Sequence, residues 1–285
     1  MNERWDSKKG QKPIRPVTPP ITGAPTANNY LQVARTYGRP DRWTEKTGRL
    51  YAKDGEFGVY DMIANAVGQA RRFIYVEDQY LYISKMNKGD MAALLNERLK
   101  KVPGLQFIAA IARTEQIENE IKQGWYRRKR FIEQITSGVS DSKNRVHILQ
   151  YKSTLTSGYD KGFIHTKMWI FDDEFAVVGS ANLNRRGYSY DGECVVGVTG
   201  KDLFARKLRV RKWVEHLSLT SSVTAAEVSE WPNGLAKLLG AKSPFERYNP
   251  DGGVDRFGDE GSPPSKTPTD ADNMVWNLFL DPDGS

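Results

Sequence analysis

Short apolar runs alternate with helical stripes of apolar residues along most of this chain. Apolar side chains recur at the spacing of one helix face between residues 56 and 72, and a strand-like run, Phe73–Glu77, follows directly. Asp90 stands where it can cap a helix that begins at Met91. Further strands are expected at 105–112 and 146–150, and further helices at 91–101, 115–136 and 201–217. This alternation predicts an α/β fold in which helices sandwich a mixed β-sheet.

A second pattern, between residues 163 and 178, predicts a β-hairpin. Phe163–Phe171 is rich in aromatic and branched residues, a polar Asp-Asp-Glu turn follows it, and Phe175–Val178 forms the second strand. Residues two apart on a strand point to the same face, so His165 and Lys167 are expected to project side by side.

The polar residues of this hairpin suit phosphoryl transfer. The imidazole of His165 can attack phosphorus or protonate a leaving oxygen, and the ammonium of Lys167 can neutralise phosphate oxygens. Ser180 and Asn182 can donate hydrogen bonds to the same oxygens, and Glu193 is the carboxylate expected to orient His165. This chemistry needs no metal, and the three His and one Cys are not at metal-ligand spacing, so no cofactor is expected.

The stretch from His165 to Asn182 reads His-x-Lys-x4-Asp-x6-Gly-Ser-x-Asn. A lone His-x-Lys is usually an ordinary strand face, and a lone Gly-Ser-x-Asn is usually a turn. Joined at this spacing they resemble the HKD motif of the phospholipase D superfamily. Asp172 holds the Asp position of the motif and lies at the hairpin turn, so its expected role in the site is to hold that turn by hydrogen bonds.

A second resemblance lies between Arg71 and Leu81, a segment similar to the strand and loop that true phospholipases D carry between their two motifs. Cardiolipin synthases and HKD nucleases usually differ there. The resemblance implies a phospholipase D-like sheet, one half of a pseudo-twofold pair, acting on glycerophospholipids. It also implies that two imidazoles act on one phosphodiester through a phosphohistidine. We assign His165 as the general acid in the first place and as the nucleophile in the second. Water or another alcohol would release the product.

Most members of the family carry two HKD motifs on one chain, whereas this sequence has one. We expect it to be the C-terminal half of a two-motif enzyme. Its partner half could be a separate chain, a missing N-terminal region or a second copy in a homodimer. A homodimeric HKD nuclease and an inactive half-enzyme are the alternatives.

Charge is unevenly distributed along the 285 residues. Residues 249–285 hold eight acidic and two basic residues and therefore carry a net charge of −6. Since the whole chain has a net charge of +7, the other residues carry +13. A basic body favours an anionic partner such as a phospholipid surface or nucleic acid. The resemblance to phospholipases D implies a phospholipid membrane surface and makes nucleic acid the unexpected partner. The cluster Trp125–Arg130 is either a solvated helix face or a contact with phosphate headgroups. The cellular compartment is not predicted; with no apolar run long enough to span a bilayer and no signal peptide, we expect a soluble or peripheral protein.

Three regions are expected. Residues 1–27, with five of the 14 prolines, form an extended linker-like segment, 28–220 form the catalytic half, and 221–285 form a loop-rich acidic extension. Cys194 lies in an apolar strand pattern and is expected to be a small core residue.

Overall fold

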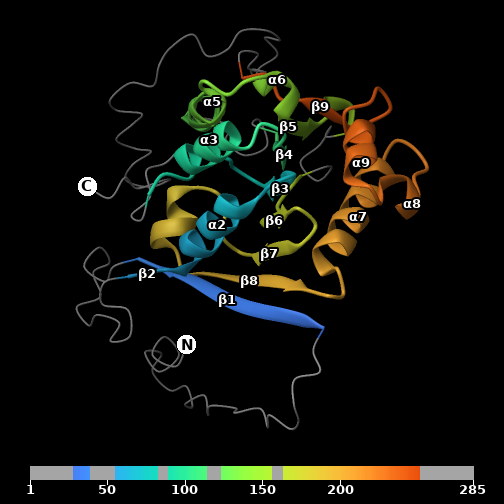
Figure 1. Cartoon of the computed structure of the whole chain (residues 1–285). Coiled ribbons are helices and arrows are strands. Elements are labelled where there is room, and N and C mark those ends of the chain that lie inside the picture. The colour runs from blue at the N-terminus through green and yellow to red at the C-terminus, as the bar shows by residue number, and fades with distance from the viewer. Residues whose placement is uncertain (1–27, 39–54, 83–88, 114–122, 156–162, 251–285) are drawn as a thin grey trace, which may run out of the picture.

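The computed structural model describes residues 28–38, 55–82, 89–113, 123–155 and 163–250. Their strands form one nine-stranded sheet in the order β2-β1-β8-β7-β6-β3-β4-β5-β9 (Figure 1). The strands are β1 (Asn29–Tyr37), β2 (Glu56–Phe57), β3 (Phe73–Asp78), β4 (Gln106–Ile111), β5 (Val146–Tyr151), β6 (Met168–Phe171), β7 (Phe175–Gly179), β8 (Glu193–Gly200) and β9 (Phe245–Arg247).

The sheet is mixed, and β3 lies directly beside its middle strand, β6. β3 pairs parallel with β4, and β4 pairs parallel with β5, while β3 pairs antiparallel with β6 on its other side. β3 and β4 are buried along almost their whole length, as strands covered on both faces should be. The β6–β7 hairpin therefore lies in the interior of the sheet, next to its most deeply buried strand.

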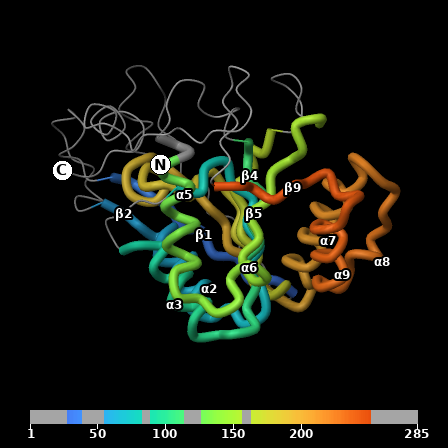
Figure 2. Tube along the Cα trace, turned by 90° about the horizontal axis from the view of Figure 1, so that it is seen from above, coloured from blue at the N-terminus to red at the C-terminus, as the bar shows by residue number. Residues whose placement is uncertain are grey.

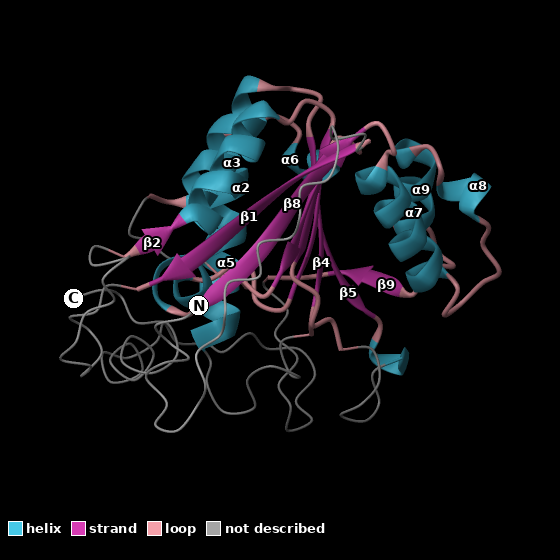
Figure 3. Cartoon of the chain, turned by 90° about the horizontal axis from the view of Figure 1, so that it is seen from below, coloured by secondary structure: helices cyan, strands magenta, loops and turns pink. Residues whose placement is uncertain are grey.

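Helices cover both faces of the sheet and leave a core on each (Figures 2 and 3). One layer holds α2 (Gly58–Gln69), α3 (Met91–Lys101), α5 (Gln123–Thr136) and the short α6 (Ser142–Arg145); the other holds α7 (Phe204–Leu217), α8 (Ala225–Val228) and α9 (Trp231–Leu238). The predicted α/β sandwich is confirmed. The cap of α3 is as expected, because the Asp90 carboxylate accepts a hydrogen bond from Ala93 N at 3.1 Å. In the described residues, no helix is long and apolar enough to cross a membrane.

The hairpin differs from its prediction at one end, because β6 begins at Met168 and not at Phe163. The last residue of β7, Gly179, donates from its N–H to Lys167 O at 3.1 Å, and the next residue, Ser180, already bonds to Cys194 on β8. No strand of the described residues pairs with residues 163–166, so His165 and Lys167 stand just outside the regular strand.

The region after residue 220 also differs from its prediction. Helices α8 and α9 and strand β9 join the domain: β9 pairs with β5, and Leu235, Leu238 and Phe245 lie in the core that α7 covers. The boundary placed at 220 therefore does not separate a loop-rich extension from the catalytic unit. Residues 1–27 and 251–285, with the proline-rich segment and the acidic tail, lie outside the described residues.

Cys194 is exposed, so the expectation that it is a core residue is wrong. Side chains alternate along β8, and Val195 rather than Cys194 joins the core.

Candidate active site

The segment that holds His165 and Lys167 reaches the surface at the start of the β6–β7 hairpin. His165 is exposed and Lys167 is half-buried, and the Lys167 ammonium donates a hydrogen bond to the His165 carbonyl at 2.7 Å. The aromatic ring of Phe163 lies 5.8 Å from the imidazole, centroid to centroid. The motif therefore places His165 and Lys167 next to each other at the N-terminal end of β6.

Both groups have perturbed acidity. Partial burial, and then the charge of Lys167, lowers the pKa of His165 below its usual value. Burial also lowers the pKa of Lys167, while the carboxylates of Asp78 and Glu193 oppose that shift. A lowered pKa makes the His165 imidazolium a stronger acid and leaves more of the neutral imidazole at neutral pH, which suits a group that must give up a proton and then take one.

Ser180 and Glu193 bond to each other. The Ser180 hydroxyl donates a short hydrogen bond to the Glu193 carboxylate and accepts one from Cys194 N at 3.1 Å. Burial raises the pKa of Glu193, and the Ser180 hydrogen bond opposes the rise. Glu193 is the first residue of β8, whose pairing with β7 places its carboxylate beside Ser180. Among the described residues, Glu193 accepts its side-chain hydrogen bond from Ser180, and no hydrogen bond joins Glu193 to His165. The expected contact of Glu193 with the His165 ring is therefore not formed here, and the Ser180 proton points to Glu193.

The side chain of Asn182 has an unsatisfied hydrogen-bond acceptor among the described residues. Its side-chain oxygen is buried and, within the described ranges, has no hydrogen-bond partner. Its backbone carbonyl accepts from Asn184 N at 2.8 Å, and the chain then turns so tightly that a Cβ on Gly187 would lie 2.4 Å from that carbonyl oxygen. A glycine at 187 is thus required for the close approach that holds the Asn182 turn.

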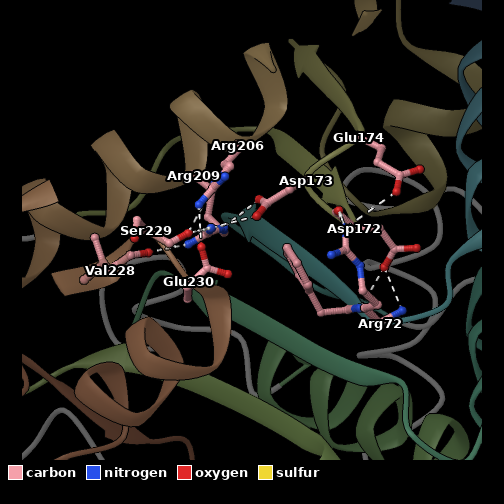
Figure 4. A network of polar contacts seen from close by, with 10 residues as sticks. Arg72, Asp172, Asp173, Glu174, Arg206, Arg209, Val228, Ser229 and Glu230 are labelled. Atoms are coloured by element: carbon pink, nitrogen blue, oxygen red, sulfur yellow. Dashed lines mark hydrogen bonds and ion pairs between the residues drawn. The ribbon is translucent and has the colours of Figure 1, made fainter. Parts of the chain in front are cut away.

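Asp172 holds the hairpin turn in place. Its carboxylate accepts hydrogen bonds from the backbone N–H groups of Arg71 at 2.7 Å and of Arg72 and Phe73 at 2.8 Å. The Arg72 guanidinium donates a further short bond to the Asp172 carbonyl, as Figure 4 shows. These bonds fit the structural role expected for Asp172 and tie the motif to the start of β3.

The next residue extends this anchoring in a way the sequence did not indicate. Asp173 receives two hydrogen bonds, at 2.6 and 2.7 Å, from the guanidinium of Arg209 on α7 (Figure 4). Arg209 is fully buried and also donates to the carbonyls of Val228 and Ser229. One buried arginine therefore joins the hairpin turn to the helix layer on that face.

Asp172→Ala should lower the free energy of unfolding by about 2 to 4 kcal/mol, because it leaves backbone N–H groups without an acceptor. Alanine is also disfavoured at the left-handed φ of 55° found at this position. Urea denaturation followed by circular dichroism measures the effect. The matched control is Glu174→Ala in the same turn, whose side chain is 79% exposed and makes only a 3.6 Å ion pair with Arg72. Equal stability of the two variants would contradict this role.

Two residues near the site received no role from the sequence. Asp78, the last residue of β3, is fully buried and accepts a hydrogen bond from Leu183 N at 2.7 Å. Arg128, in the basic cluster of α5, is 1% exposed and donates to the carbonyls of Gln79 and Tyr80. For Arg128 neither reading of the cluster holds, since it is a buried anchor rather than a solvated or lipid-facing cation. An acid at the end of an apolar strand was the one available signal for Asp78.

No group of three or more His, Cys, Asp or Glu side chains that could hold a metal ion occurs among the described residues.

Comparison with known proteins relates this site to a family. Residues 106–216 match the family model described as cardiolipin synthase, PLD-like domain, and the complete motif from His165 to Asn182 lies inside that match. A cardiolipin synthase of Staphylococcus aureus is 30% identical over 87 residues, and phospholipase D alpha 1 of Cynara cardunculus is 24% identical over 253 residues. Residues 106–216 of the chain are therefore a PLD-like domain of the phospholipase D superfamily, a family of PLD-like phosphodiesterases.

The matches cover only parts of these proteins. The cardiolipin synthase alignment takes in 28% of this chain and 17% of the relative, and the phospholipase D alignment 64% and 31%. Among solved structures, a phospholipase D family member, Nuc from Salmonella typhimurium, aligns with 64% of this chain and 91% of its own, at 11% identity and a TM-score of 0.42. Cardiolipin synthases and a phospholipase D are both among the relatives, so the expectation of the phospholipase branch stays a prediction.

Proposed function

We propose that the chain contributes one half of a phospholipase D-type active site, which cleaves glycerophospholipids through a phosphohistidine intermediate. The observation that carries the proposal is the pairing of His165 with Lys167 beside the Asn182 turn, in a member of the superfamily. The net charge of +7 supports an anionic phospholipid surface as the place where substrate is met.

In this proposal His165 moves the protons. As an imidazolium it donates a proton to the oxygen of the departing alcohol while a second imidazole attacks phosphorus. As a neutral imidazole it then takes a proton from the water, or the acceptor alcohol, that attacks the phosphohistidine. Water gives phosphatidate, and an alcohol gives a new phospholipid.

Lys167 and Asn182 would bind the non-bridging phosphate oxygens. The Lys167 ammonium supplies the positive charge that the transition state needs, and the Asn182 amide can add a hydrogen bond. Ser180 would act indirectly, because its hydroxyl proton is bonded to Glu193.

The second imidazole must come from a second HKD motif. The other histidines of the sequence are His147 and His216, and neither has a lysine two residues later. Both are buried: His147 bonds to Gln106 at 2.9 Å, and His216 bonds to Glu77 at 2.9 Å. A separate chain, a further region or a second copy of this chain would supply the partner motif.

Lys167→Arg should lower kcat of the assembled enzyme by about 100-fold. Arginine keeps the positive charge but is larger and planar, so it cannot place a point charge on the phosphate from the same half-buried position. Choline release from phosphatidylcholine vesicles measures the loss. Lys152→Arg, at a half-buried lysine that donates to Ala241 O, is the matched control and should retain full activity. Equal rates for the two variants would remove Lys167 from close phosphate contact.

The proposal as a whole is tested by quenching the assembled enzyme and phosphatidylcholine in a mildly alkaline denaturant, because the P–N bond of a phosphohistidine is labile to acid. The histidines are then analysed by mass spectrometry. A phosphatidyl group on a motif histidine is expected. Turnover with no histidine adduct, even when breakdown is slowed, would contradict the proposed intermediate.

A further inference from the structure

Asp78 links the end of β3 to the turn that begins at Asn182 (the Asn182 turn). One carboxylate oxygen accepts hydrogen bonds from Tyr80 N at 2.7 Å and Leu81 N at 3.3 Å, and the other accepts from Leu183 N at 2.7 Å. Tyr82 N returns a bond to Leu183 O at 3.1 Å. Leu183 directly follows Asn182. The Asp78 carboxylate therefore fixes the backbone next to the Asn182 amide, which is proposed to bind phosphate.

A second anchor holds the same loop from the other side. Arg128 of α5 donates to Tyr80 O at 2.9 Å and to Gln79 O at 3.1 Å from an almost fully buried position. The segment after β3 is therefore held between helix α5 and the Asn182 turn. These bonds fix the position of the Asp78 carboxylate.

The charge itself needs an explanation, because burying a carboxylate is costly. Burial raises the pKa of Asp78 to about 6, against the opposing effects of three backbone N–H groups and of Lys167. Among the described residues, the ionisable groups that face it are Lys167, before β6, and the buried Tyr188, whose pKa is raised by burial and then by Asp78. The next acid, Glu77, points to the other face, where it meets His216. Lys167 is thus the cation that this carboxylate supports.

We propose that Asp78 is a positioning residue of the half-site: its buried carboxylate holds the Asn182 turn through Leu183 and stabilises the positive charge of the half-buried Lys167. The proposal rests on the function proposed above, since it gives Lys167 and Asn182 their shared task. A merely structural Asp78 would hold the loop without affecting the titration of Lys167.

The wild-type chain offers a test that needs no variant to fold. The amide proton of Leu183, assigned by NMR on leucine-labelled protein, should shift as Asp78 titrates, with a midpoint near the Asp78 pKa of about 6. The same midpoint should persist in His165→Asn, which removes the nearby imidazole as a source of the shift. An amide resonance that does not move between about pH 4 and 8 would overturn the proposal.

A second measurement reads Lys167 directly. In protein labelled with ¹³C at the lysine side chains, the Lys167 signal, identified by its loss in Lys167→Arg, should titrate at lower pH in Asp78→Asn than in wild type. Asp90→Asn is the matched control, because Asp90 also accepts a backbone N–H but caps α3, and it should leave the Lys167 midpoint unchanged. An unchanged midpoint in Asp78→Asn would overturn the proposal. Both signals are read without turnover, so an inactive chain would count against the proposed function and not against this role.

Discussion

His165→Asn is expected to lower the rate of phosphodiester cleavage by about 10⁴-fold or more in any assembled form of the enzyme. Asparagine has roughly the reach of the imidazole but can neither donate a proton to the leaving alcohol nor accept one from water. The loss should appear in kcat, because the variant keeps Lys167 and Asn182, the residues proposed to bind phosphate.

The fold should tolerate this change. The His165 side chain is exposed, and its backbone carbonyl, which accepts from Lys167 at 2.7 Å, is present in the variant as well. Thermal unfolding of His165→Asn should match wild type within about 1 kcal/mol. A correctly folded variant that retains substantial activity would take His165 out of the mechanism.

The isolated chain is expected to show almost no phospholipase D activity, with a rate at least about 10³-fold below that of an assembled two-motif enzyme. The two imidazoles act as a unit, and one of them alone should lose most of the rate. Large apolar side chains on β1 are exposed, with Tyr30 at 74%, Leu31 at 70% and Val33 at 63%, which makes self-association a risk. Choline release should therefore be measured together with molar mass by light scattering. Robust turnover by a stable homodimer would refute the need for a separate partner half.

Local patterns were enough to predict much of the fold. The apolar runs of β3, β4 and β5, the capped helix α3 and the β6–β7 hairpin all follow from residues close together in sequence. The start of β6 did not follow, because it depends on where β7 leaves the sheet. Strand β9 has only three residues, Phe245–Arg247, too few to show a period, and it forms by pairing with β5.

The candidate site, too, could be predicted from the sequence only in part. The spacing of the motif was sufficient to single out His165, Lys167 and Asp172. The partner of Glu193 was not predictable, since the position of its carboxylate depends on the register between β7 and β8. Asp78 was missed because its bond to Leu183 joins residues 105 positions apart. Contacts of this kind depend on tertiary packing and leave no local pattern.

The central claim, that this chain supplies one of two catalytic imidazoles, is tested most directly by reconstitution. The purified chain is mixed with a polypeptide of the family that carries its own His-x-Lys-x4-Asp motif, and choline release from phosphatidylcholine vesicles is followed for the mixture and for each component. The account predicts activity in the mixture alone, and its loss when either His165 or the partner's motif histidine is replaced by asparagine. Activity that survives the replacement of His165, or that the chain shows undiminished on its own, would contradict it.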